Sequence, residues 1–179
     1  ATGSIYECLV VMNDEALTQE QVNEVAKLSL VNEASGYTKP IASLYDLVEA
    51  VMGADMPCMP QVEPYFRLTQ VKTALFDDML KPTRNILFVD INPQKYTQLK
   101  TKVANDYWST PQAICRVQSP SEEEFVTYWL EHGEEIRDWF VNQEIKRQMK
   151  FYRASTNKAA RAILQAEGYD MLIPEDYMV

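Results

Sequence analysis

The sequence has 179 residues with a formal net charge of -9, and 46% of its residues are hydrophobic. This length suits one domain, and such a chain can bury a core without disulfide bonds or metal ions. Phosphate backbones and anionic membrane surfaces attract Lys and Arg, so the acidic balance argues against binding to either. No apolar run approaches the roughly 20 residues that span a bilayer.

The chain begins with Ala1, and the first residues lead directly into a predicted strand. Neither the positively charged region nor the apolar segment of a signal peptide is present. We therefore expect that any signal peptide has been removed from this sequence.

The first predicted strand covers residues 6–12, which contain a continuous apolar run from Cys8 to Met12. Such a run is typical of a strand covered on both faces. A helix is predicted to follow, because Thr18 can cap its first turn while Gln21 reaches back to the backbone of Thr18. Leu17 can pack on the first turn as a hydrophobic staple.

A second helix is predicted from Pro40 to Gly53, with proline in its first turn. Three prolines within residues 55–64 exclude a helix or a central strand there. Residues 65–71 alternate between apolar and polar side chains, which favours a strand at a sheet edge. A short helix is predicted over 75–80.

The run from Ile86 to Val89 predicts the central strand of the sheet, next to the first strand. Asn92 and Pro93 end this strand, and a polar loop follows to residue 98. Two further strands are predicted over 100–108 and 112–118.

The longest helix is predicted to begin with Ser119 as its cap and Pro120 at its first position. Three glutamates from Glu122 crowd its start and several cations crowd its end, which complements the helix dipole. The last helix is predicted over 157–167, with Gly168 closing a Schellman motif.

Together these elements predict an α/β fold in which a mixed sheet of about five strands has helices on both faces. We expect residues 1–179 to form a single domain. The tail over 170–179 carries several apolar side chains, so we also expect it to lead into a further C-terminal domain. The alternative is that the tail docks on this domain as an edge strand or pad.

Polar side chains follow the two central strands where each strand ends. Asp14 follows the first, and Asp90 and Asn92 end the other. If the two strands are parallel neighbours, these groups meet where α/β folds bind ligands and could hold a hard cation such as magnesium. The alternative is that Asp and Asn simply form turns at strand ends.

Sulfur-containing residues gather around the proline-rich loop, namely Met52, Met56, Cys58 and Met59. Thioether and thiolate ligands select cuprous copper, but methionines also fill gaps beneath irregular loops. Cys8 and Cys115 lie in predicted strands, so we expect both thiols to be buried and Cys58 to be the accessible one. The sequence predicts no cofactor.

The single histidine, His132, falls on the apolar stripe of the longest helix, where a core or boundary position is expected. No nucleophile is linked to it, so no catalytic triad is predicted. The aromatic residues Tyr96, Tyr107 and Trp108 lie in or beside loops. They fit either an interaction surface or the core, because aromatic anchors serve both roles.

Five segments match, in order along the chain, the sequence patterns of one protein family. The first is ECLVVMND at residues 7–14, similar to a family opening E-V/I/L-L-V-V-M-D-D. Residues 57–64 resemble a loop P-G-L-P-Q-P-E-P, and residues 84–91 resemble a strand R-N-I-L-I-V-D-I. The segments 108–112 and 119–123 follow in matching order. Together the five segments resemble an uncharacterised family of predicted lipoproteins from Bacteroides-type bacteria. Cys58 departs from the glycine of the loop pattern, and the stretch between Lys27 and Asp55 is longer than usual.

The resemblance implies export, a lipid anchor on a cysteine upstream of Ala1 and a location in the periplasm or at the outer membrane. It implies no catalytic residues. We therefore expect a non-enzymatic binding or interaction module whose partner is an envelope protein, a small ligand or a second domain of the same protein. Membrane association is expected only through the removed anchor. The alternative is a metal-dependent enzyme that uses Asp14 and Asp90.

Overall fold

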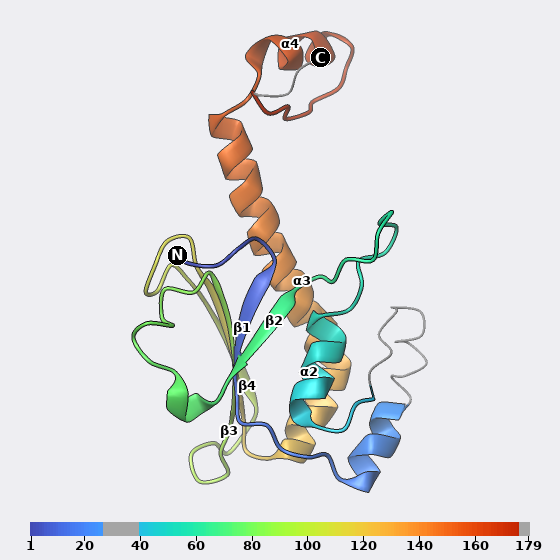
Figure 1. The fold of residues 1–179 in the computed structure, drawn as a ribbon, viewed down its shortest axis with the longest axis vertical. Helices are drawn as coiled ribbons and strands as arrows, with labels where there is room; N and C mark the ends of the chain where they lie inside the picture. The colour runs from blue at the N-terminus through green and yellow to red at the C-terminus, as the bar shows by residue number, and fades with distance from the viewer. Residues whose placement is uncertain (27–39, 176–179) are drawn as a thin grey trace. The chain divides into compact units, whose positions relative to one another are not determined.

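The computed structural model describes residues 1–26 and 40–175 (Figure 1). The chain divides into two compact units, Ala1–Val141 and Asn142–Val179, and the division falls within a long helix, α3 (Glu122–Ala154). Each unit is described by itself below. The expectations of a single domain and of a further C-terminal domain remain predictions.

The first unit is built on a five-stranded sheet with the order β2-β1-β3-β5-β4. Its strands are β1 (Glu7–Val11), β2 (Arg67–Val71), β3 (Asn85–Ile91), β4 (Lys100–Asn105) and β5 (Ala113–Ser119). Four of them run parallel, whereas β4 pairs antiparallel with β5. The predicted α/β fold with a mixed sheet of about five strands is confirmed, and neither apolar strand lies at an edge.

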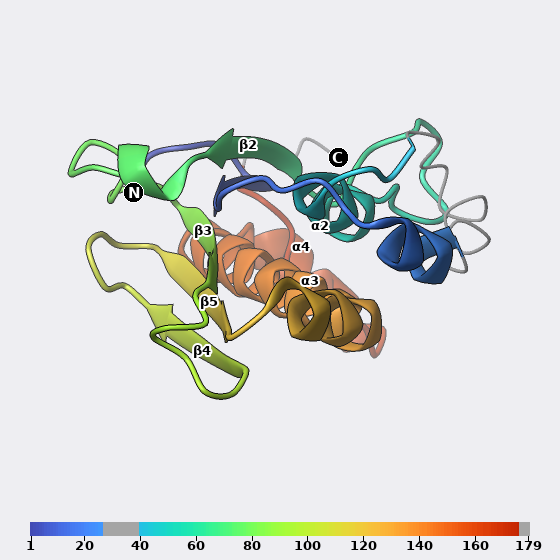
Figure 2. The same ribbon diagram turned by 90° about the horizontal axis from the view of Figure 1, so that it is seen from below.

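Three helical segments cover one face of this sheet. They are residues 19–26, α2 (Leu44–Met52) and the first part of α3. Figures 1 and 2 show α2 and α3 on the same side of the strands. Trp129 of α3 is fully buried in this layer, where its indole nitrogen donates a hydrogen bond of 3.2 Å to the carbonyl of Leu47. The main core therefore lies between these helices and the sheet.

The opposite face of the sheet carries a smaller core. Its buried members are Leu9, Val11, Ile86, Phe88 and Ile114. The 3-10 helix η1 (Thr73–Leu75) and the segment after it cover part of this face, since Phe76 and Leu80 pack on it. The short helix predicted over 75–80 is, in the structure, this 3-10 helix at residues 73–75, and the chain continues through turns at residues 78–80.

Two helices begin later than the sequence pattern predicts. Ser43 caps α2 in a capping box with Asp46, three residues beyond Pro40. Ser121 caps α3, because its hydroxyl accepts a hydrogen bond of 3.2 Å from the amide of Glu124. Ser119 is instead the last residue of β5 and is fully buried.

The second unit contains the end of α3 and α4 (Lys158–Ala166). Asn157 caps α4 as predicted, accepting a hydrogen bond of 3.0 Å from the amide of Ala160. Gly168 has a φ of +86°, and the amide of Tyr169 bonds the carbonyl of Leu164 at 2.9 Å. These contacts form the predicted Schellman motif.

The tail of the second unit returns toward the start of α4. The amide of Asn157 donates to the carbonyl of Ile173 at 2.9 Å, and the amide of Glu175 donates to the carbonyl of Ser155 at 3.0 Å. Asp170 also accepts hydrogen bonds from Arg161. The described part of the tail therefore folds back on its own unit.

Candidate functional site

The carboxyl ends of the parallel strands meet at one edge of the sheet in the first unit. β1 is followed in the chain by β2 on one side, while β3 pairs with β1 on the other side. The connection after β1 therefore leads to one side of the sheet and the connection after β3 leads to the other, so the strand order reverses between β1 and β3. Open α/β sheets bind their ligands at such a switch point, outside the carboxyl ends of the strands.

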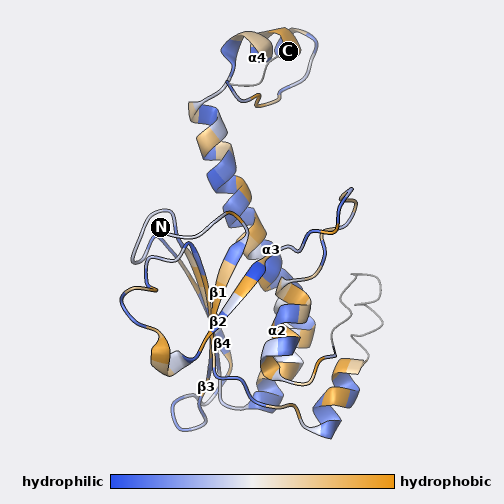
Figure 3. Cartoon of the chain, viewed as in Figure 1, coloured by the Kyte–Doolittle hydropathy of each residue, from blue (hydrophilic) through white to orange (hydrophobic). Residues whose placement is uncertain are grey.

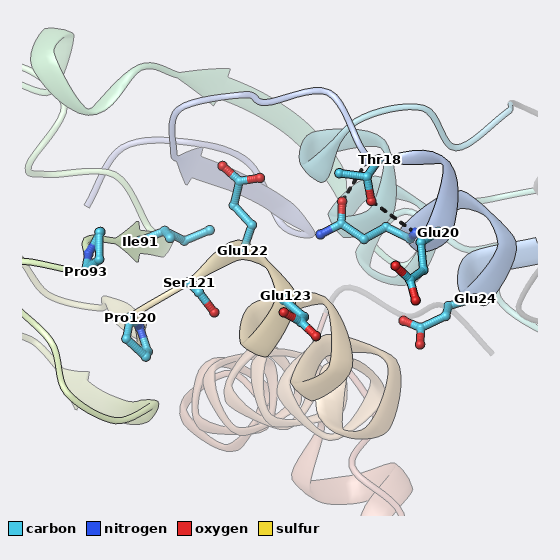
Figure 4. A pocket seen from close by; sticks show the side chains of 10 residues that line it. Thr18, Glu20, Glu24, Ile91, Pro93, Pro120, Ser121, Glu122 and Glu123 are labelled. Atoms are coloured by element: carbon cyan, nitrogen blue, oxygen red, sulfur yellow. Dashed lines mark hydrogen bonds between the residues drawn. The ribbon is translucent and has the colours of Figure 1, made fainter.

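A pocket of about 520 Å³ lies at this edge (Figure 4). Its apolar part comes from residues at or just beyond the ends of β3 and β5, namely Ile91, Pro93 and Pro120. Its polar part comes from the starts of two helices. These residues are Thr18, Glu20, Gln21, Glu24, Ser121, Glu122 and Glu123.

Both helices that border the pocket are fixed at their first turn by side-chain caps. The side-chain oxygen of Gln21 accepts a hydrogen bond of 2.8 Å from the amide of Thr18, and the Thr18 hydroxyl accepts one of 3.3 Å from the amide of Gln21. This is the predicted capping box. This capping box and the Ser121 cap of α3 fix the first turns of the two helices that carry the polar lining residues.

The pocket is acidic. Glu20 and Glu24 border it from one helix, and Glu122 and Glu123 border it from α3 (Figure 4). No Lys, Arg or His is among the described residues that line it. Glu122 and Glu123 also complement the helix dipole. Glu24 lies beyond the first turn, and like charges four residues apart in a helix are mildly destabilising. The arrangement therefore favours a cation.

Asp14 lies just beyond β1, where it supports a helix. Its carboxylate accepts a hydrogen bond of 3.0 Å from the amide of Tyr45, in the first turn of α2. This contact satisfies one of the free amides of a helix start.

Asp90 and Asn92 are also held by neighbouring groups. Asp90 accepts a hydrogen bond from the hydroxyl of Tyr96 and lies 3.5 Å from the ammonium of Lys95. The side-chain oxygen of Asn92 accepts hydrogen bonds from the amides of Gln94 at 2.9 Å and Lys95 at 3.1 Å. Asp90 and Asn92 thus make the kind of contacts expected of turn-forming residues at a strand end, which was the alternative to a cation site. Among the described residues, no group of three or more His, Cys, Asp or Glu is placed to hold a metal ion.

The three aromatic residues predicted from loops do not form one cluster. Tyr107 and Trp108 contact each other, with ring centroids 5.0 Å apart. Trp108 also packs against Phe76 and Phe88 of the second sheet face. Tyr96 binds Asp90 instead, near the end of β3. Trp108 therefore combines both roles, since it packs on the smaller core and remains 36% exposed.

The cysteines are distributed as expected: Cys8 and Cys115 are buried, and Cys58 is exposed. Burial raises the pKa of the Cys115 thiol to about 12. His132 is partly buried on α3, with its ring tilted against that of Tyr128 and its Nδ1 3.1 Å from the carboxylate of Glu135. Of the sulfur residues near the proline-rich loop, Met52 is fully buried and Met59 is exposed.

The comparison with protein families gives one match. Residues 23–153 match a family described as a domain of unknown function, DUF8532. The chain belongs to the DUF8532 family. No curated protein and no solved structure matches it. The match begins after β1 and runs almost to the end of α3, so it includes Glu24, Ile91 and the start of α3 from the pocket.

No helix in the described part of the chain is both long enough and apolar enough to cross a membrane.

The glutamates of the pocket were not predicted as a site. The sequence pattern of Glu122 and Glu123 was explained by the helix dipole alone. The signal that could have revealed the pocket is the pair Glu20 and Glu24, which puts two like charges on one helix face directly after a parallel strand. The segment with Glu20 and Glu24 is far in the sequence from Glu122 and Glu123, and only the fold brings the two segments to one pocket.

Proposed function

We propose that the chain is a non-enzymatic binding module of a bacterial envelope lipoprotein and that the pocket at the sheet edge binds a small cationic ligand. The observation that carries this proposal is that Glu20, Glu24, Glu122 and Glu123 all line one pocket, with no Lys, Arg or His among its described lining residues. The envelope location is supported by the resemblance of five sequence segments to lipoproteins of Bacteroides-type bacteria.

The chemistry of the pocket favours an organic cation. Four glutamates line the pocket, and its other lining residues include Ile91, Pro93 and Pro120. A volume of about 520 Å³ falls within the range of pockets for small organic ligands. An alkylamine or polyamine would place its ammonium groups near the glutamates and its carbon chain against the apolar residues. A bare metal ion would leave most of that space unfilled.

The helix starts explain why the acidic groups are tolerated without a ligand. The first turns of two helices carry partial positive charge, which offsets part of the repulsion among the glutamates. Glu24, beyond the first turn, gains least from this effect. A bound ammonium group would therefore relieve the most charge repulsion beside Glu20 and Glu24.

The test is a calorimetric titration of the protein with spermidine. We expect binding, and we expect the double variant Glu20→Gln/Glu24→Gln to weaken it by about 30-fold, since each of the two carboxylates near an ammonium contributes on the order of 1 kcal/mol in a solvated site. The matched control is Glu63→Gln/Glu175→Gln, which removes two exposed carboxylates elsewhere and should bind as the wild type does. Equal weakening by both double variants would reduce the effect to net charge and refute the pocket.

A second titration with magnesium separates the enzyme alternative from the binding module. Under the proposal, magnesium binds no more tightly to the wild type than to Asp14→Asn. Tight magnesium binding that Asp14→Asn and Asp90→Asn both abolish would favour the metal-dependent enzyme instead.

A further inference from the structure

The second unit has an unusual charge distribution. Between Ile145 and Ala166 there are six cationic residues, and all 26 Asp and Glu residues of the chain lie outside this stretch. The cations are Lys146, Arg147, Lys150, Arg153, Lys158 and Arg161. The acidic balance of the whole chain therefore conceals a strongly basic segment formed by the end of α3 and by α4.

Apolar side chains lie beside these cations and are exposed. Lys146, Lys150 and Arg153 follow one another at the i, i+4, i+7 spacing of one helix face, and Ile145, Met149 and Tyr152 form the adjacent stripe by the same spacing. These three apolar residues are 36–43% exposed. Figure 3 shows the last turns of α3 as mostly hydrophilic with hydrophobic residues between.

The exposure continues past this stripe. Phe151 and Ile163 are each 68% exposed, and α4 has no buried residue. Phe151 and Tyr152 also border a hollow of about 540 Å³ with Ser155, Pro174 and Glu175. A basic helical segment with exposed aromatic and aliphatic residues is typical of helices that lie in the interface of an anionic membrane.

Few of the cations are neutralised within the unit. Arg147 pairs with Glu144 at 2.7 Å and Arg161 with Asp170 at 2.9 Å. In the described part of the chain, Lys146, Lys150 and Lys158 take part in no ion pair. Two copies that paired this face would bring like charges together, which argues against a homodimer through it.

We propose that the basic segment 145–166 docks on an anionic phospholipid surface. A membrane is favoured over an acidic protein because the centres of protein interfaces are depleted in lysine, whereas clusters of four to eight Lys and Arg on an amphipathic helix are the usual feature of anionic-lipid binding. The inference rests on residues 145–166 and is independent of the acidic pocket.

The experiment measures co-sedimentation of the full chain with vesicles of pure phosphatidylcholine and with vesicles that contain one third phosphatidylglycerol. We expect binding to the anionic vesicles only, and we expect added salt to weaken it. The triple variant Lys146→Gln/Lys150→Gln/Arg153→Gln should weaken binding by at least about tenfold, because each cation near the surface contributes about a fivefold factor.

The matched control is Lys72→Gln/Lys100→Gln/Lys102→Gln, which removes three exposed cations from the first unit and changes the net charge equally. It should bind the anionic vesicles as the wild type does. Phe151→Ala should weaken binding to the same vesicles without altering its salt dependence, and circular dichroism checks that each variant stays helical.

A parallel titration with polyglutamate identifies an acidic protein partner. Binding to polyglutamate that the triple variant abolishes, together with no binding to anionic vesicles, would assign the segment to an acidic polypeptide and overturn the proposal. Equal loss of vesicle binding in the triple variant and its control would also overturn it, because the effect would then follow net charge alone.

Discussion

The side-chain amide of Gln112 donates a hydrogen bond of 2.6 Å to the backbone carbonyl of Lys81. The same amide donates to the carbonyl of Thr83 at 2.7 Å, and the side-chain oxygen accepts from the amide of Trp108 at 2.9 Å. Gln112 is buried, so one side chain joins the β4–β5 hairpin to the segment before β3.

Replacing Gln112 with alanine should destabilise the protein by about 3 kcal/mol, because the substitution removes three hydrogen bonds and leaves part-buried backbone groups without this partner. Urea denaturation measures the change, and Gln98→Ala on an exposed loop serves as the control. A loss below about 0.5 kcal/mol, the usual range for surface substitutions, would contradict this role for Gln112.

Substitutions of Trp129 should lower the free energy of unfolding by an amount that grows with the part of the side chain removed. Trp129→Phe keeps most of the buried ring but loses the hydrogen bond to Leu47, which should cost about 1–2 kcal/mol. Trp129→Ala also opens a cavity and should cost about 3–5 kcal/mol. Thermal and urea unfolding of both variants test the order, and equal losses would mean that the hydrogen bond, not the packing, carries the contribution.

The buried thiol of Cys115 should make stability depend on pH in the alkaline range. Its pKa is raised from 9.0 to about 12 in the folded protein, so the unfolded chain loses the proton first as pH rises. Stability should be unaffected below about pH 9 and should fall between the two pKa values, by up to about 1.4 kcal/mol per pH unit. Comparing the unfolding free energy of wild type and Cys115→Ala as a function of pH isolates this slope. Parallel curves for the two proteins between about pH 9 and 12 would refute the contribution of Cys115.

The exposed thiol should react first with a thiol reagent in the native state. Cys58 is exposed, whereas Cys8 and Cys115 are only 2% and 1% exposed. Mass spectrometry of briefly labelled protein should find the label on Cys58, and the other two cysteines should be labelled only after denaturation. Early label on Cys115 would contradict its position in β5.

Gly168 should be costly to replace despite open space around it. A Cβ at this position would meet no atom within 4 Å, so the cost is conformational and comes from the φ of +86°. Gly168→Ala should destabilise the end of α4 by about 1 kcal/mol. Faster hydrogen exchange at the amide of Tyr169 is the expected result, and unchanged exchange would contradict the Schellman assignment.

Much of the fold could be predicted because local signals agreed with the tertiary structure. The apolar runs around Val10 and Leu87 predicted two interior strands, and both lie inside the sheet. The Thr18–Gln21 capping box and the Gly168 stop depend only on residues a few positions apart, so the sequence alone contains them.

The misplaced helix start has a physical reason in the strand before it. Two serines, Ser119 and Ser121, flank Pro120, and both are suitable caps by type. Pairing of β5 with β3 extends to Ser119, opposite Ile91, which leaves Ser121 as the cap. Strand length depends on the partner strand, and a local pattern does not contain that information.

The candidate site was harder to predict because it depends on contacts between distant segments. Asp90 and Tyr96 are both visible in the sequence, but their hydrogen bond follows from the path of the loop after β3. The pocket joins residues near Glu20 to residues near Glu122, which only the parallel sheet brings to one edge.

The most direct test of the binding module is an NMR titration of isotope-labelled protein with spermidine. The account predicts that amide resonances at the two helix starts, those of Thr18, Gln21, Ser121 and Glu122, shift together and saturate, and that Glu20→Gln/Glu24→Gln shifts them far less at the same concentration. Shifts spread over exposed acidic residues throughout the chain without saturation, or no shift at these four amides, would contradict a cation-binding pocket at the sheet edge.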